Sequence, residues 1–232
     1  MQQIFLIIII MSILYYIFFK ENFVSNYSRD RYLKSSGVAF NAKKGRKKSG
    51  GCFLYDQTVK LESGNIKQIS QVKIGDCVLC VNSNGELVYS DVVYIPHDFN
   101  HNKNTFIEII TNTNKSLKIT QCHLIPTVNN IIPAKDLAIN DKIITLDGIE
   151  TIKEINVFED NGFYTIITND EYLVVNNIVV SPFGGGMNHT VAHKLCNVFR
   201  SMYNISSDYD KSKFIQTNLE ALYYNHLEQL LV

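Results

Sequence analysis

"SGGCFLYDQTVKLESG", residues 49–64, marks the change from a basic, irregular segment to short β-type runs. Cys52 follows two glycines and opens this part of the chain. Turn signals built on glycine then recur between apolar runs, at 63–65, 84–85, 147–148 and 161–162. Asn-Gly and Asp-Gly pairs between such runs are strong signals for β-hairpins. We therefore expect an all-β domain over residues 51–183.

A weak internal repeat lies within this region. Residues 66–79, "IKQISQVKIGDCVL", align with residues 131–144, "IIPAKDLAINDKII". The alignment pairs Gly75 with Asn140, and these two residue types adopt a positive φ most readily. Each is followed by an aspartate and a β-type run, so the repeat predicts two related, pseudo-symmetric β subdomains.

Composition narrows the function classes. The chain has 232 residues, enough for one well-cored domain with appendages. Its 22 basic and 22 acidic side chains cancel, so the overall charge gives no argument for nucleic acid as a partner, and we expect none. We expect a monomer.

The five cysteines, 52, 77, 80, 122 and 196, are an odd number, so at least one thiol is free in any intramolecular pairing. Cys77 and Cys80 form a C-x-x-C pattern inside a β-type run. A spacing of three places their side chains on opposite faces of a strand. We expect two small core or surface residues there, not a zinc or redox pair.

Residues 4–19, "IFLIIIIMSILYYIFF", are continuously apolar and at the short end of the length that spans a bilayer. The segment lacks a basic n-region and an A-x-A cleavage site, which favours an uncleaved signal anchor over a removed signal peptide. We expect a hydrophobic helix within residues 1–21, single-pass membrane association and the secretory pathway. The basic residues that follow would hold that side in the cytoplasm, so the orientation stays open.

The rest of the chain completes the predicted domain organisation. Residues 22–50 lack periodicity and include "KKGRKK", as expected for a basic flexible linker. Residues 184–232 form a predicted helical appendage, with helices over 189–203 and 210–232.

Cys52 is a candidate nucleophile for an N-to-S acyl shift, although a lone cysteine is more often a buried core residue. A cysteine sulfur can attack the preceding peptide carbonyl and convert the amide into a thioester. The site must strain the bond, protonate the leaving nitrogen and stabilise the oxyanion. Gly51 tolerates a distorted backbone and leaves its carbonyl open to attack.

The segment "LKITQCHLIP", residues 117–126, supplies the candidate proton donor. His123 has a side chain whose pKa lies near neutrality, and Thr120 can hold the same amide through its hydroxyl or main chain. In a straight strand these two residues point to opposite faces, so both reach Cys52 only if the chain bends between them. We therefore predict a strand end here, with Pro126 in support.

These residues belong to a set of patches that occur in order along the chain: "GCF" at 51–53, T-V-K-L-E-S-G at 58–64, I-G-D-x-V-L at 74–79, V-Y-S-D-V at 88–92, T-x-x-H at 120–123 and L-V-V-N-N-I-V-V-S at 173–181. The set resembles the Hint fold shared by inteins and the C-terminal Hog domain of Hedgehog proteins. The resemblance implies that Cys52 attacks the Gly51 carbonyl, with Thr120 and His123 assisting departure of the nitrogen. In animal Hedgehogs a sterol hydroxyl then resolves the thioester.

The chain departs from the family pattern at several positions. His97 falls where the family has an aspartate that is thought to activate the sterol hydroxyl. A histidine can still act as a general base. The second nucleophile could therefore be another alcohol or water. Ser181-Pro182 stands where animal Hedgehogs carry a cysteine, and the His-Asn ending that inteins use for splicing is missing. Residues 20–51 leave no room for a folded signalling domain.

His189 and His193, with Cys196 nearby, have a spacing that can bind a metal on one helix face. No third ligand or orienting carboxylate is evident, so we expect a polar helix face, no metal and no cofactor.

Three hypotheses remain open for the function. The first is self-cleavage at Gly51-Cys52 with transfer to a sterol or other alcohol, and the second is the same cleavage resolved by water or thiols alone. The third is a membrane-tethered β-domain that binds without cleaving.

Overall fold

The computed structural model describes residues 51–184 and 188–205; for 97–102 and for Leu195, Val198, Met202 and Ile205 it describes the backbone alone. The strands are β1 (Phe53–Leu54), β2 (Thr58–Lys60), β3 (Ile66–Gln68), β4 (Cys77–Val81), β5 (Leu87–Thr111), β6 (Ser116–Thr120), β7 (Leu124–Pro126), β8 (Ile131–Pro133), β9 (Lys142–Thr145), β10 (Gly148–Thr168), β11 (Tyr172–Val175) and β12 (Ile178–Val180). The helices are η2 (Ile69–Gln71), η3 (Ala134–Asp136), α2 (His189–Leu195) and α3 (Asn197–Ile205). The predicted all-β class is confirmed.

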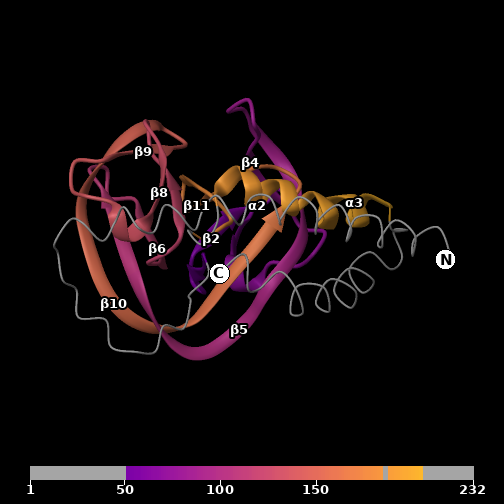
Figure 1. Ribbon diagram of the computed structural model, residues 1–232, viewed down its shortest axis with the longest axis horizontal. Helices are drawn as coiled ribbons and strands as arrows, with labels where there is room; N and C mark the ends of the chain where they lie inside the picture. Colours follow the sequence, from indigo (N-terminus) through magenta and orange to yellow (C-terminus); the bar gives the residue numbers. More distant parts are fainter. Residues whose placement is uncertain (1–50, 185–187, 206–232) are drawn as a thin grey trace, which may run out of the picture. The chain divides into compact units, whose positions relative to one another are not determined.

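Two long antiparallel strands, β5 and β10, connect the two halves of the fold. They run side by side with a strong curve, from β8 and β9 at one end to β4 and β11 at the other (Figure 1). The prediction of a hairpin turn at Asn161-Gly162 is wrong, because both residues lie inside β10. Gly162 has a φ of 81° and the register shifts between Asn161 and Phe163, so the glycine accommodates a β-bulge that bends the strand.

The predicted pseudo-symmetry is confirmed by matching local structures. Each repeat has a short strand, a 3-10 turn, a residue with positive φ and a second strand; that residue is Gly75 at 89° in one repeat and Asn140 at 77° in the other. The aspartate that follows each one folds back in the same way. Asp76 Oδ2 accepts from the nitrogen of Lys73 at 2.7 Å, and Asp141 Oδ2 accepts from that of Ala138 at 2.8 Å.

β1 is held in the core between β6 and β10. Phe53 is fully buried and pairs with Ile119 of β6 on one side and with Tyr164 of β10 on the other. Burial of a phenylalanine side chain contributes about 1.5–3 kcal/mol. The two residues that precede Phe53 are therefore held at a defined place in the fold.

The predicted helix over 189–203 is interrupted. α2 ends before Cys196 and α3 begins at Asn197. The buried Arg200 docks α3 on β10, since its Nε donates to the carbonyl of Thr168 at 2.8 Å. The predicted helix at 210–232, the apolar segment 4–19 and the linker lie outside the described residues. Within 51–184 and 188–205, no helix has the length and hydropathy to cross a membrane.

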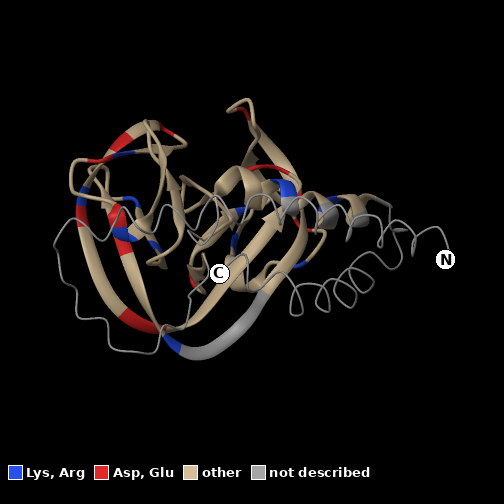
Figure 2. Cartoon of the chain, viewed as in Figure 1, with Lys and Arg blue, Asp and Glu red and all other residues tan. Residues whose placement is uncertain are grey.

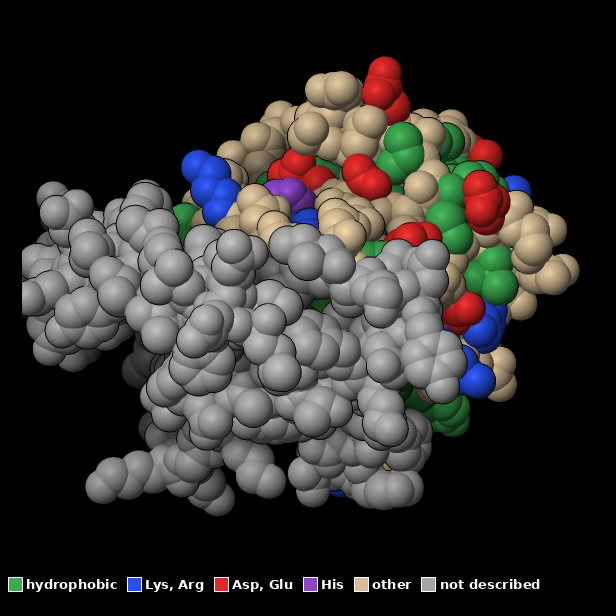
Figure 3. Space-filling view, turned by 90° about the vertical axis from the view of Figure 1, so that its right-hand side faces the viewer, with side chains coloured by type: hydrophobic (Ala, Val, Ile, Leu, Met, Phe, Trp, Pro, Cys, Tyr) green, Lys and Arg blue, Asp and Glu red, His purple; other side chains and the backbone are tan. Residues whose placement is uncertain are grey.

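Charged side chains are interspersed by sign along the described strands (Figure 2). On the face that is turned toward the viewer in Figure 3, lysine and arginine side chains lie apart from one another, between acidic and apolar groups. The visible part of this face carries side chains of both signs.

Candidate functional site

Two hydrogen bonds with Thr120 hold the backbone of Cys52, one through the Thr120 side chain and one through its nitrogen. The Cys52 nitrogen donates to Oγ1 of Thr120 at 3.0 Å, and the nitrogen of Thr120 donates back to the Cys52 carbonyl at 2.9 Å. The side chain of Cys52 is 1% exposed, and burial raises the pKa of its thiol. The sulfur is therefore protonated at neutral pH, and a base must remove that proton before it can attack.

The chain bends between Thr120 and His123, as the spacing predicts. β6 ends at Thr120, and the nitrogen of His123 donates to the Thr120 carbonyl at 3.0 Å across a tight turn. β7 begins only at Leu124. The turn brings the side chains of both residues toward Cys52.

The ring of His123 is fully buried and packs edge-on against Phe53, with ring centroids 4.4 Å apart. Its Nε2 lies 2.7 Å from the carbonyl of Ser181. A carbonyl only accepts, so Nε2 carries the ring proton and Nδ1 has a lone pair.

Nδ1 of His123 is buried with no partner at hydrogen-bond geometry among the described residues. The backbone of Cys52 is nevertheless close enough to raise the pKa of the ring, as does that of Ser181. Burial has the larger and opposite effect and lowers the pKa of His123 to about 4. The ring is neutral at pH 7 and presents a basic nitrogen beside Cys52.

Gly51 lies directly against a distant part of the backbone. A Cβ at this position would be 2.3 Å from the carbonyl carbon of Phe183 and 2.4 Å from the nitrogen of Gly184. Real side chains do not approach so closely, so the fold admits only glycine here without displacement. The peptide bond between Gly51 and Cys52 is thus confined from both sides.

The segment after β12 forms the surface against which Gly51 packs. The nitrogen of Leu124 donates to the carbonyl of Phe183 at 3.0 Å, and His123 forms a β-bridge with Gly184. Ser181 lies two residues before Phe183 and accepts from its nitrogen through Oγ at 3.0 Å. Ser181 therefore touches both His123, through its carbonyl, and the backbone beside Gly51.

A second set of polar side chains extends from Ser181. Its Oγ lies 3.0 Å from Nδ1 of His189, and Nε2 of His189 lies 3.1 Å from Oε1 of Glu171. In the sequence, Ser181 is notable only as a departure from a family pattern, and no motif marks Glu171. Nothing in their spacing signals this contact, because it joins three segments that meet only in the fold.

His97 lies in β5, where its backbone is opposite Thr165 of β10. The hydroxyl of Thr165 donates to the carbonyl of Pro182 at 3.4 Å, which connects this register position with the segment beside Gly51. The side chain of His97 is outside the described set, and its role as a base stays a prediction.

The histidines of α2 have partners other than a metal. His189 contacts Ser181 and Glu171, and Nδ1 of His193 accepts from Nη2 of Arg200 at 3.1 Å. Cys196 is fully buried. In 51–184 and 188–205, side chains described by the structure form no group of three or more His, Cys, Asp or Glu suited to a metal.

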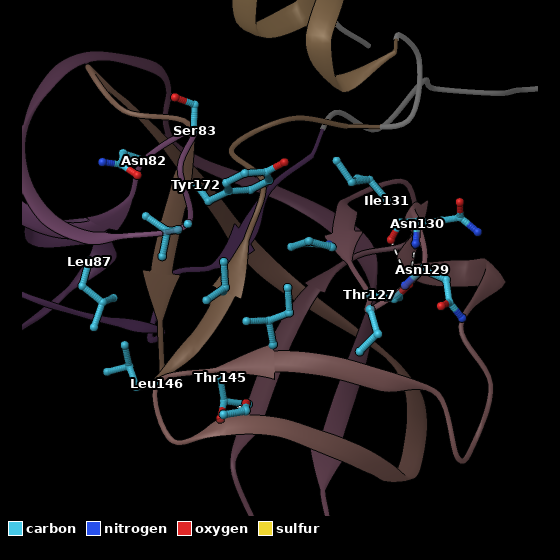
Figure 4. A pocket seen from close by; sticks show the side chains of 17 residues that line it. Asn82, Ser83, Leu87, Thr127, Asn129, Asn130, Ile131, Thr145, Leu146 and Tyr172 are labelled. Atoms are coloured by element: carbon cyan, nitrogen blue, oxygen red, sulfur yellow. Dashed lines mark hydrogen bonds between the residues drawn. The ribbon is translucent and has the colours of Figure 1, made fainter.

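A pocket of about 570 Å³ opens beside this region, between strands of the two halves (Figure 4). Its lining is mainly apolar and includes Leu87, Leu146, Val179 and Tyr172. The ring of Tyr172 stacks on His189 with centroids 4.8 Å apart and an interplanar angle of 4°. One wall of the pocket is thus in contact with the side chain that binds the Ser181 hydroxyl.

The sequence and the fold of this chain are similar to those of known proteins. A family model described as the Hint module matches residues 41–231. The protein hedgehog of Drosophila virilis is 25% identical over 168 residues, or 68% of this chain and 35% of that protein. The Sonic hedgehog protein of Xenopus laevis is 28% identical over 176 residues, or 69% and 39%. The chain thus spans between about a third and two fifths of the length of these relatives.

Solved structures agree on the fold. The crystal structure of the gp41-1 intein superposes with a TM-score of 0.50 at 20% identity, covering 57% of this chain and 99% of the intein. The DnaB intein from Synechocystis sp. PCC 6803 gives a TM-score of 0.50 at 17% identity, covering 56% and 97%.

Proposed function

The chain belongs to the Hint family, and we propose that it cleaves its own backbone between Gly51 and Cys52 through an N-to-S acyl shift. One observation carries this proposal: the buried, neutral ring of His123 places Nδ1 beside the backbone of Cys52, and among the described residues this nitrogen has no partner at hydrogen-bond geometry. A basic nitrogen in this position serves a proton transfer at that backbone and has no evident structural role.

The reaction begins when His123 Nδ1 takes the proton of the Cys52 thiol. The thiolate attacks the carbonyl carbon of Gly51, and a tetrahedral oxyanion forms. The C–N bond then breaks, and the protonated ring gives its proton to the departing nitrogen. The products are a thioester between Gly51 and Cys52 and a free amino group on Cys52, and the ring returns to its neutral state.

Thr120 and Gly51 position the bond that breaks. The hydroxyl of Thr120 accepts the amide N–H of Cys52, which fixes the direction of the nitrogen that must receive the proton. The close contact of Gly51 with Phe183 confines the acyl side. Confined geometry lowers the entropic part of the barrier, since the reacting atoms are already near one another.

We also propose that a second nucleophile releases the N-terminal segment from the thioester. A sterol or another alcohol would leave residues 1–51 as an ester, and water or a thiol would leave an acid or a new thioester. His97 is the proposed base for this step, from its register beside Thr165. The apolar segment 4–19 supports a reaction at a membrane in the secretory pathway.

The test uses the full chain with a C-terminal tag, incubated with dithiothreitol or hydroxylamine. We expect a fragment that begins at Cys52, and its absence in Cys52→Ala. Cys77→Ser is the matched control, because Cys77 lies in β4 away from the cleavage site. A chain that stays intact with both reagents would contradict the proposal and leave a binding role. The mass of the N-terminal fragment from lipid-containing reactions then separates transfer to an alcohol from hydrolysis.

A further inference from the structure

The hydroxyl of Ser181 is held for proton transfer to His189. Glu171 lies 3.1 Å from Nε2 of His189, and a carboxylate accepts hydrogen bonds, so Nε2 carries the ring proton. Nδ1 therefore has the lone pair, and the Ser181 hydroxyl donates to it at 3.0 Å. The same oxygen accepts from the nitrogen of Phe183, and Ser181 is fully buried. A nucleophile, a base and a group that orients the base are thus connected in series, as in hydrolytic triads.

The surroundings of His189 keep the base neutral. Burial is the main cause that lowers the pKa of His189, and the nearby guanidinium of Arg200 acts in the same direction. Glu171 opposes both effects. The remaining neighbours are aromatic: Tyr172 stacks on one face, and the His193 ring lies 6.2 Å away. A neutral imidazole can accept the hydroxyl proton at pH 7.

The position of Ser181 connects this relay with the cleavage site. Its carbonyl accepts from Nε2 of His123 at 2.7 Å, so the residue is bonded to both histidines. Phe183, whose nitrogen donates to the Ser181 hydroxyl, has its carbonyl group against Gly51. The Ser181 hydroxyl and Gly51 thus lie against the same residue, Phe183, the first at its nitrogen and the second at its carbonyl group.

We propose that Ser181 accepts the acyl group from Cys52 before any external nucleophile does; this rests on the proposed self-cleavage. The Ser181 oxygen attacks the Gly51 carbonyl carbon of the thioester while His189 takes the hydroxyl proton. The C–S bond breaks, a C–O bond forms, and the Cys52 thiolate leaves and receives the proton from His189. No oxidant, reductant or cofactor is needed.

The product is a branched chain in which residues 1–51 are esterified to Ser181 and Cys52 has a free amino group. An oxygen ester is more stable than a thioester, so the transfer is favourable. Water or an alcohol then attacks the ester. Ser181 leaves as the hydroxyl with a proton that passes through His189. Ser181 therefore separates the cleavage step from the release step.

The branched chain has a chemical signature that the thioester lacks. Full-length protein is incubated at neutral pH, quenched in acid and denaturant, and divided between dithiothreitol and hydroxylamine. Cyanobenzothiazole condenses with an N-terminal cysteine only when both its amine and its thiol are free, so it marks the molecules in which the acyl group has left the Cys52 sulfur. We expect a marked species with the mass of the whole chain that resists the thiol and is cut by hydroxylamine. Peptide mapping then locates the ester at Ser181.

Variants assign the roles. Ser181→Ala loses the thiol-resistant species and retains the acyl group on Cys52, so the entire linkage becomes thiol-labile. Ser181→Cys keeps a nucleophile at this position and yields a thioester that maps to residue 181. Ser63→Ala, an exposed turn residue, leaves the distribution as in the parent chain.

The roles of His189 and Glu171 are tested by measuring how the acyl group divides between the Cys52 thioester and the Ser181 ester over time. His189→Gln slows the appearance of the thiol-resistant species about 100-fold or more. Glu171→Gln slows it about tenfold or more, because the ring loses the partner that sets its tautomer. A purely structural role would change the amount of folded protein and leave the partition unaltered.

Two results would overturn the inference. If dithiothreitol cuts the chain at Cys52 and no molecule of whole-chain mass is marked before the thiol is added, Ser181 accepts nothing and the proposed self-cleavage stands. If neither reagent cuts the native chain and no free Cys52 amine forms, both proposals fail.

Discussion

The backbone of Gly51 lies directly on that of Phe183, so closely that a Cβ would be 2.3 Å from the Phe183 carbonyl carbon. Residue 51 precedes β1 and contributes no core side chain. We therefore expect Gly51→Ala to disturb the cleavage site more than the fold. A shift of the scissile carbonyl by about 1 Å can slow a reaction about 100-fold.

The measurement for Gly51→Ala combines the rate of thiol-induced cleavage with a thermal unfolding curve. An unchanged rate would show that the contact does not constrain the bond. Equal losses of rate and of folded protein would show instead that the contact is structural.

Thr120 accepts the amide hydrogen of Cys52, and this bond is lost in Thr120→Val without a large change in shape. Loss of a hydrogen bond to a buried group costs about 1–3 kcal/mol, which corresponds to a rate about 5- to 150-fold lower if the bond is made in the transition state. Thr120→Ser keeps the hydroxyl and is the matched control. The rate of thiol-induced cleavage checks the prediction, and similar rates for Val and Ser would refute it.

His123→Gln retains a side-chain amide that can donate to Ser181 and lacks the basic nitrogen. General acid–base groups contribute about 100- to 10,000-fold, so we expect a loss of this size in the cleavage rate. The appearance of the Cys52 fragment over time is the measurement. Full cleavage in His123→Gln would rule out the proton-transfer role.

The pH profile of cleavage follows from the state of His123. Its pKa is lowered to about 4, and the reaction needs the neutral ring, so the rate falls as the pH drops through about 4. A histidine with an ordinary pKa would give the same decline near pH 6.5. Rates with a trapping nucleophile in excess at each pH decide between the two.

Folding stability depends on the same group with a definite sign. The folded pKa of His123 is about 4, below the unfolded value, so the unfolded chain binds the proton first and stability falls as the pH drops from about 6.5 to 4. The loss is about 3 kcal/mol for this residue. Urea unfolding of Cys52→Ala, which lacks the proposed nucleophile, measures this loss. Adding His123→Gln to that variant flattens the dependence, and a slope that remains unchanged would assign the effect to other histidines.

Local sequence signals predict much of the fold, because they act within a few residues. Asn84-Gly85 lies in the turn between β4 and β5, and Asp147 lies in the turn before β10, whose first residue is Gly148; the φ values of the two glycines are 81° and 111°. Asn161-Gly162 has the same local signal, yet it lies inside β10. There the pairing of β10 with β5 on both sides of the glycine continues the strand. Tertiary pairing thus overrides the turn preference.

The candidate site likewise has one part that the sequence predicts and one part that depends on tertiary packing. The spacing of Thr120 and His123 predicts the bend that brings them to Cys52, since strand geometry alone requires it. The contact of Gly51 with Phe183 and the bond between Ser181 and His189 depend on where the segment after β12 packs. No periodicity or spacing in the sequence determines that packing.

β1 begins with Phe53, one residue after the bond that is proposed to break, and this strand is inserted between β6 and β10. Cleavage at Gly51 would therefore remove none of the described strands β1–β12, and the new N-terminus would stay inside the protein. The spent domain would keep its architecture with a cysteine amine enclosed at its centre. Each molecule would therefore react only once, and the free amine of Cys52 would distinguish a reacted molecule from an unreacted one.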